Sequence, residues 1–128
     1  MKAVRYYSKL GNTKSIAEAI AEGAGVEAIS IEEEPALNKY VDVLFLGGAP
    51  YANIMAPELK AYALKLDPSL VGKVVLFTTS NWSRRTVLAL KKLLCNKGIK
   101  VEDKYFYAHM LQIKGRIQAA KAFGQTTR

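Results

Sequence analysis

The chain has 128 residues, of which 50% are hydrophobic and 23% charged, proportions typical of a globular domain and not of a disordered or fibrous protein. No apolar run approaches the ~18 residues needed to cross a bilayer, no secretory signal is present, and the single cysteine allows no internal disulfide, so we expect one cytoplasmic domain over residues 1–128 with no membrane association. The formal net charge of +8 raises the question of nucleic-acid binding, but the lysines are not interleaved with aromatic residues and no nucleic-acid-binding motif occurs, which favours a solvated basic surface.

Strand-like and helix-like segments alternate from the N-terminus. The hydrophobic pattern predicts a strand over residues 1–7 and an amphipathic helix over 13–24. A short strand at 26–31 follows, and residues 32–40 allow at most a short helix or a loop. An almost unbroken apolar strand follows at 41–48, and its last two residues are glycines.

The second half continues the alternation. A helix that opens with proline is predicted over 57–66, and a buried strand over 72–80. A helix at 84–98 is closed by glycine. A strand at 99–108 has some polar alternation, which indicates a sheet edge, and a short helix at 114–124 completes the chain.

The middle strands are apolar on both faces, which is typical of a parallel sheet covered by helices on both sides. Five strands joined by right-handed crossovers predict a three-layer, doubly wound α/β fold with a five-stranded parallel sheet in the order 2-1-3-4-5. Ligands of such folds bind beyond the carboxyl ends of the strands, where the winding reverses. The loops of interest are therefore residues 8–13, 48–56 and 79–84.

The first of these loops, Ser8-Lys9-Leu10-Gly11-Asn12-Thr13, carries hydroxyls at both ends and leads into the first helix. The first turn of a helix has unpaired N–H groups and the positive end of the helix dipole, so it is suited to bind a phosphate. An ordinary N-cap by Asn12 or Thr13 is the alternative. Because a cap explains only one hydroxyl, the pattern favours a phosphate site.

The segment YYSKLGNTKSIAEAIAEG resembles the phosphate-binding segment of flavodoxins, whose pattern is [S/T]-x-T-G-x-[S/T]. Ser8, Gly11 and Thr13 match this pattern, and Leu10 replaces the usual threonine. VDVLFLGGAPYANIMAPELKAYALKL and GKVVLFTTSNW look like the two strands and flavin-contacting loops of the same family, with Trp82 at the place of a common aromatic residue. The resemblance covers essentially the whole chain.

The resemblance implies that the cofactor is FMN, with its phosphate at residues 8–13 and its ring between residues 49–54 and 79–83. Tyr51 and Trp82 are the aromatic residues of the two ring loops, and either one is able to stack on a flavin. The candidate cofactor-binding residues are Ser8, Lys9, Leu10, Gly11, Asn12, Thr13, Ala49, Pro50, Tyr51, Ala52, Asn53, Thr79, Ser80, Asn81, Trp82 and Ser83.

The function implied by the resemblance is electron transfer to or from a larger redox enzyme. One alternative is a small FMN-dependent flavoenzyme, such as a quinone reductase or a flavodoxin-type protoporphyrinogen oxidase. Another is a flavin-free binding domain on the same scaffold. No nucleophile–base pair or metal site is evident, and His109 has no second histidine with which to share such a role.

The chain departs from the family in its charge, because flavodoxins are usually acidic. The second half of the chain carries 13 Lys+Arg against 3 Asp+Glu. We therefore expect an acidic redox partner protein. The basic residues expected near the flavin are Lys9, Lys14, Arg84 and Arg85.

Two further residues carry expectations of their own. Arg5 is unusual in a central strand and is expected to reach solvent or to pair with a nearby acid. Cys95 is expected to be a buried, small apolar residue of its helix.

Overall fold

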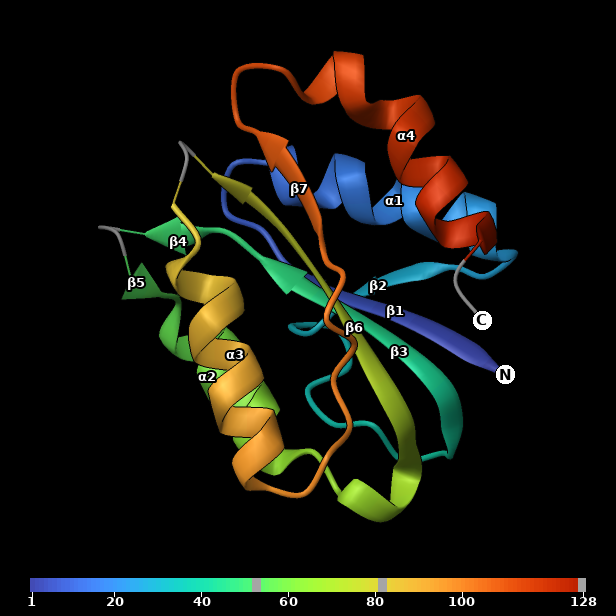
Figure 1. The fold of residues 1–128 in the computed structure, drawn as a ribbon, viewed down its shortest axis with the longest axis vertical. Coiled ribbons are helices and arrows are strands. Elements are labelled where there is room, and N and C mark those ends of the chain that lie inside the picture. The colour runs from blue at the N-terminus through green and yellow to red at the C-terminus, as the bar shows by residue number, and fades with distance from the viewer. Residues whose placement is uncertain (52–53, 81–82, 127–128) are drawn as a thin grey trace.

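The computed structural model describes residues 1–51, 54–80 and 83–126, which form a five-stranded sheet with helices on both faces (Figure 1). The strands are all parallel and lie in the order β2-β1-β3-β6-β7, as the sequence predicts. The three-layer, doubly wound architecture is therefore confirmed. The strands are β1 (Lys2–Tyr7), β2 (Ala28–Ser30), β3 (Val41–Gly48), β6 (Val71–Ser80) and β7 (Phe106–His109).

The helices lie in two layers. Figure 1 shows α1 (Asn12–Ala24) and α4 (Ile113–Thr126) side by side on one face of the sheet, and α2 (Pro57–Lys65) and α3 (Arg85–Asn96) on the other. A short 3-10 turn, η1 (Pro68–Leu70), leads from α2 into β6. Within the described residues, no helix is long and apolar enough to span a membrane.

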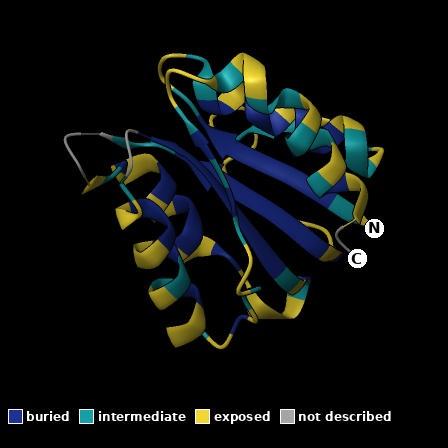
Figure 2. Ribbon diagram, turned by 45° about the horizontal axis from the view of Figure 1, so that its top comes forward, coloured by how far each residue is buried: buried dark blue, intermediate teal, exposed yellow. Residues whose placement is uncertain are grey.

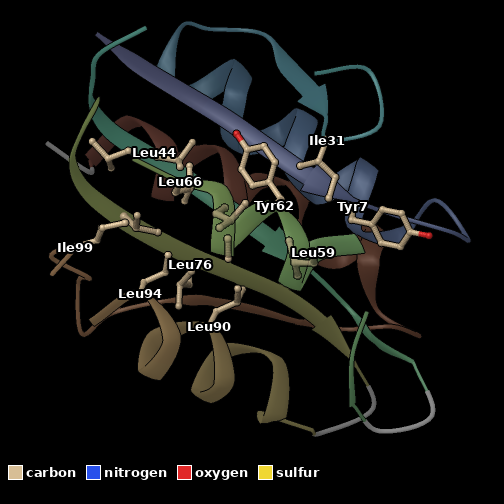
Figure 3. Close-up of a cluster of buried hydrophobic side chains, with 14 of the residues drawn as sticks. Tyr7, Ile31, Leu44, Leu59, Tyr62, Leu66, Leu76, Leu90, Leu94 and Ile99 are labelled. Carbon is tan, nitrogen blue, oxygen red and sulfur yellow. The ribbon is translucent and has the colours of Figure 1, made fainter. Parts of the chain in front are cut away.

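Each face of the sheet has its own apolar core, because successive strand residues point to opposite sides. On β1, Val4 and Tyr6 pack with α1 and α4, whereas Ala3 and Tyr7 pack with α2 and α3. The central strands are buried along most of their length (Figure 2). The leucines of the α2–α3 face meet in one cluster (Figure 3).

Residues 31–40, which connect β2 to β3, form turns and loop but no helix. The sequence allowed for either outcome. Ile31 is buried with the α2–α3 core, and Leu37 packs against the same core. This irregular segment therefore covers the part of the sheet where a doubly wound fold usually has a crossover helix.

The last two predicted elements need correction. The continuous strand expected over 99–108 is wrong, because only Val101 forms a bridge to Val74 before β7 begins at Phe106. Between them the chain leaves the sheet, and Asp103 pairs with Lys91 of α3 at 2.8 Å. β7 is nevertheless an edge strand, as expected. The final helix is longer than the 114–124 predicted, since it covers 14 residues.

Two local features also differ from expectation. A two-stranded antiparallel ribbon, β4 (Pro50–Tyr51) and β5 (Ile54–Met55), occurs in the loop after β3 and was not predicted. Cys95 is exposed instead of buried, because the inward face of α3 is formed by Leu90 and Leu94, and the next residue turns away from it.

Candidate functional site

The three loops singled out from the sequence meet at the carboxyl edge of the sheet, where the strands end. They enclose a pocket of about 300 Å³. The winding reverses between β1 and β3, so the pocket occupies the position at which ligands bind in doubly wound folds. Its lining residues are Ser8, Leu10, Asn12, Thr13, Ala49, Pro50, Thr79, Ser80, Ser83 and Met110.

The first loop leads into the N-terminus of α1 and supplies no side-chain cap for it. Gly11 is the N-cap residue in a left-handed conformation, with φ of 92°, and no side chain of the described residues caps the helix. N-capping by Asn12 or Thr13 is therefore wrong. The positive φ explains the glycine, because residues with a Cβ rarely adopt it. The first-turn amides and the positive end of the dipole are left for another partner.

The hydroxyls of this turn hold its shape. The Gly11 N–H donates to Ser8 Oγ at 3.0 Å, and Ser15 Oγ donates to the Gly11 carbonyl at 3.1 Å. Since Ser8 Oγ acts as the acceptor, its own proton remains to be donated. Ser8 lines the pocket, whereas Ser15 does not line it.

Thr13 lies deeper than the sequence suggests. Its side chain is 1% exposed, and its Oγ1 is 2.7 Å from Oγ1 of Thr79, which is also 1% exposed. This pair joins the first turn of α1 to the end of β6. Only one of the two hydroxyls needs to donate in the pair, so the other still has a proton for a group in the pocket.

The loop after β3 starts from a closely packed strand end. A Cβ on Gly47 would overlap both the ring and the backbone oxygen of Phe77 on the neighbouring strand, so glycine is needed there for close packing. Thr78 Oγ1 donates to the Gly48 carbonyl at 2.7 Å. These contacts fix the point at which Ala49 and Pro50 enter the pocket wall.

The loop after β6 is closed by its own hydrogen bonds. Ser80 Oγ donates to the Ser83 carbonyl at 2.7 Å. The Ser80 carbonyl accepts two hydrogen bonds, from the Tyr107 hydroxyl at 2.9 Å and from the Met110 N–H at 3.0 Å. β7 and the residue after its end therefore hold the start of the loop that follows β6.

Met110 is the pocket residue that the sequence reasoning missed. It follows the edge strand β7, whereas the predicted site uses only the loops after β1, β3 and β6. His109 Nδ1 accepts a hydrogen bond from the Leu111 N–H at 3.1 Å, which stabilises the turn that presents Met110. The available signal was a pair of large apolar residues, Met110 and Leu111, directly after a strand, and both are exposed.

Several predicted residues are not placed against the pocket. Ala52, Asn53, Asn81 and Trp82 lie outside the described residues, as does the side chain of Tyr51. The aromatic stacking predicted for the flavin ring therefore stays a prediction. Lys9 and Gly11 belong to the loop but not to the pocket lining.

The charges around the pocket are mostly basic and exposed. Lys9, Arg84 and Arg85 flank the pocket-lining residues along the chain, and Lys14 lies in the first turn of α1. Below the first loop, the Tyr7 hydroxyl donates to Glu58 Oε2 at 2.7 Å. This hydrogen bond lowers the pKa of Glu58, and the nearby Lys9 ammonium acts in the same direction.

Comparison with known proteins gives matches at the level of structure. No family model and no curated protein matches the sequence. A flavodoxin from the domain Archaea is similar, with a TM-score of 0.79 and 22% identity over 98% of this chain and 94% of that one. A flavodoxin, WrbA-like protein from Agrobacterium tumefaciens gives a TM-score of 0.76 and 22% identity over 97% and 92% of the two chains.

The two-electron reduced flavodoxin of Megasphaera elsdenii is similar over 99% of this chain and 100% of its own, with a TM-score of 0.70 and 23% identity. The likeness thus extends over whole chains and includes the β2-β1-β3-β6-β7 strand order. At identities of 22–23%, these similarities establish the fold alone. The chain has the flavodoxin-like fold that its sequence resembles.

Proposed function

We propose that this chain binds FMN at the carboxyl edge of its sheet and carries electrons to or from a larger redox enzyme. The observation on which the proposal rests is the uncapped N-terminus of α1, which opens into a pocket built from all three predicted loops. A helix N-terminus in that position is suited to a phosphate, and the flavodoxin-like fold supports FMN as the molecule that carries it.

The phosphate end of the site consists of the first turn of α1 and the loop before it. The amides of residues 12–14 have no partner within the helix, and Gly11 has no Cβ to obstruct an approach to them. Ser8 has a hydroxyl proton left to donate. Each such interaction with an anion at a helix N-terminus contributes roughly 0.3–2 kcal/mol.

The ring end of the site is more apolar. Ala49, Pro50 and Met110 line this part of the pocket together with the hydroxyls of Ser80 and Ser83. A flat, apolar-faced ring suits such walls, and a methionine sulfur makes favourable contacts with aromatic rings. Bound FMN would supply the redox chemistry, while these residues would orient the ring and limit its contact with water.

The exposed basic residues beside the pocket, Lys9, Arg84 and Arg85, which we call the basic rim, favour an acidic redox partner. Exposed basic residues flank two of the pocket-forming loops, and opposite charge on a partner would accelerate its association. Leu10, which is 76% exposed and lines the pocket, adds an apolar contact to the same rim. We infer that the partner presents acidic residues around a small apolar centre.

The proposal is tested by fluorescence titration of the chain with FMN and with riboflavin, which lacks the phosphate. We expect FMN to bind much more tightly. Replacing Ser8 by alanine should weaken FMN by about 10- to 100-fold, the loss of one hydrogen bond to a charged group, and should leave riboflavin unchanged. Ser15→Ala is the matched control, because it removes a hydroxyl of the same turn that does not line the pocket.

Three outcomes would contradict the proposal. Equal affinity for FMN and riboflavin would rule out a phosphate role for residues 8–13. Failure to bind either molecule would indicate a flavin-free domain. Steady NAD(P)H- or quinone-dependent turnover without a second protein would indicate an enzyme instead of a carrier.

A further inference from the structure

A charged side chain lies inside the sheet, away from the pocket at the carboxyl edge. Arg5 is in the middle of β1, between Ile29 of β2 and Leu46 of β3, and it is only 9% exposed. Burying a cation is costly unless it is paired and hydrogen-bonded. The expected partner is present, since Arg5 Nη2 donates to Glu34 Oε2 at 2.8 Å.

The guanidinium is nevertheless only partly satisfied. Nη1 donates to the Val4 carbonyl at 3.0 Å, and Nη2 donates to Glu34. Nε is buried and has no hydrogen-bond partner among the described residues. Nε and Nη2 share the edge of a guanidinium that binds a carboxylate through two parallel hydrogen bonds. Glu34 therefore fills half of an edge that suits a bidentate carboxylate.

A hollow of about 300 Å³ opens beside this pair, and both Arg5 and Glu34 line it. Glu34, Leu37, Asn38 and Lys39, from the segment 31–40 that forms no helix, make one wall of it. Its lining includes the half-buried apolar side chains of Val26, Ile29 and Leu37. A volume of this size is at the lower end of the range for small-molecule sites, so it suits a small ligand.

A second unpartnered group lies on the α2 side of the same region. The Tyr62 hydroxyl is buried, with its residue 3% exposed, and it has no hydrogen-bond partner among the described residues. Figure 3 shows the Tyr62 ring rising from α2 with its hydroxyl toward β1. Burial raises the pKa of Tyr62, and the Glu34 charge acts in the same direction, whereas Arg5 lowers it through its charge and through a side-chain interaction with the hydroxyl. The Tyr62 hydroxyl therefore lies beside the Arg5 guanidinium, on the α2 side of β1.

We propose that the hollow beneath residues 31–40 is a second binding site, which takes a small aliphatic monocarboxylate on the guanidinium of Arg5. The ligand carboxylate displaces the singly bonded Glu34 and occupies both Nε and Nη2, while its alkyl chain contacts the apolar walls. Glu34 is free to leave because its side chain is half exposed and belongs to an irregular segment. Among the described residues, the hollow shares no lining residue with the pocket proposed for FMN.

The test follows the Arg5 Nε–H resonance of the full chain by NMR while butyrate is added, with butyramide as the uncharged probe. We expect a saturable shift with butyrate and none with butyramide. Glu34→Gln should tighten butyrate binding by about tenfold, the effect of one charge-assisted hydrogen bond that no longer competes. Glu27→Gln is the matched control, because it removes the same charge from the same hollow without removing a hydrogen bond to Arg5.

The results that would overturn the proposal are equally definite. No saturable shift in either the natural chain or Glu34→Gln would mean that only water fills the free edge. Equal tightening by Glu34→Gln and Glu27→Gln would mean a general charge effect. Arg5→Met should abolish binding, and if that variant does not fold, the comparison of the two glutamine variants still decides the question.

Discussion

Replacing Thr13 by valine tests the hydroxyl pair that connects the first turn of α1 to the end of β6. Valine keeps the shape of threonine but removes the hydroxyl, so Thr79 Oγ1 loses its partner at 2.7 Å. Because both residues are only 1% exposed, water replaces that partner poorly, and the unpaired hydroxyl carries much of its desolvation cost. We expect the free energy of unfolding to fall by about 1–3 kcal/mol.

Thr79→Val should cost a similar amount, and the double variant should cost clearly less than the sum of the two. The reason is that an apolar pair of the same shape leaves no buried donor without an acceptor. Urea denaturation measures these changes, provided that the dependence on urea concentration is the same in all four proteins. If either single variant loses less than about 0.5 kcal/mol, or if the two losses add, the hydroxyls do not stabilise each other and the reasoning is refuted.

Three more predictions concern packing, acid stability and the cofactor. Gly47→Ala should destabilise the chain strongly, since the new Cβ would overlap a backbone oxygen of β6. Gly115→Ala, with open space around it in α4, should be neutral or stabilising by up to about 1 kcal/mol. Thermal unfolding compares the two variants, and similar losses of stability would contradict the packing argument. The hydrogen bond from Lys73 lowers the pKa of Glu102 from its ordinary value of 4.5, so the unfolded chain binds more protons, and this contribution to stability is present above pH 4.5 and is lost as the pH falls through the lowered pKa. As the pH falls through this range, the urea midpoint should drop less in Glu102→Gln than in the natural chain. An identical drop in both proteins would contradict a stabilising role for the Lys73–Glu102 hydrogen bond. Leu10→Thr restores the hydroxyl of the flavodoxin pattern and should tighten FMN binding by about tenfold without affecting riboflavin, as titration would show; an unchanged FMN affinity would mean that residue 10 does not reach the phosphate.

Local sequence patterns were sufficient to predict the architecture. Runs such as 41–48 and 72–80 are apolar on both faces, and only the interior of a parallel sheet covered on both sides accommodates them. The doubly wound order then follows from right-handed crossovers between a small number of strands. Once the order is known, the three loops must meet at the carboxyl edge, because all strands of the sheet end there.

Other features depend on contacts between residues far apart in the chain, and no local pattern encodes them. Thr13 pairs with Thr79 across 66 positions, which places a predicted phosphate donor in the interior. Met110 joins the pocket because its backbone bonds to the Ser80 carbonyl. Asp103 lies outside the sheet, within the segment expected to form the last strand, and it pairs with Lys91 of the helix α3.

The amino-acid sequence by itself determined the periodicities, and hence the strands, the helices and the edge of the sheet at which a ligand is expected. The tertiary structure decided that Ser8 Oγ accepts from the Gly11 N–H, that Thr13 pairs with Thr79, and that a buried arginine is bonded to only one oxygen of Glu34. The physical reason is that hydrophobic burial follows a short repeat along the chain, whereas a hydrogen bond depends on the position of two particular atoms, which only the packed elements fix.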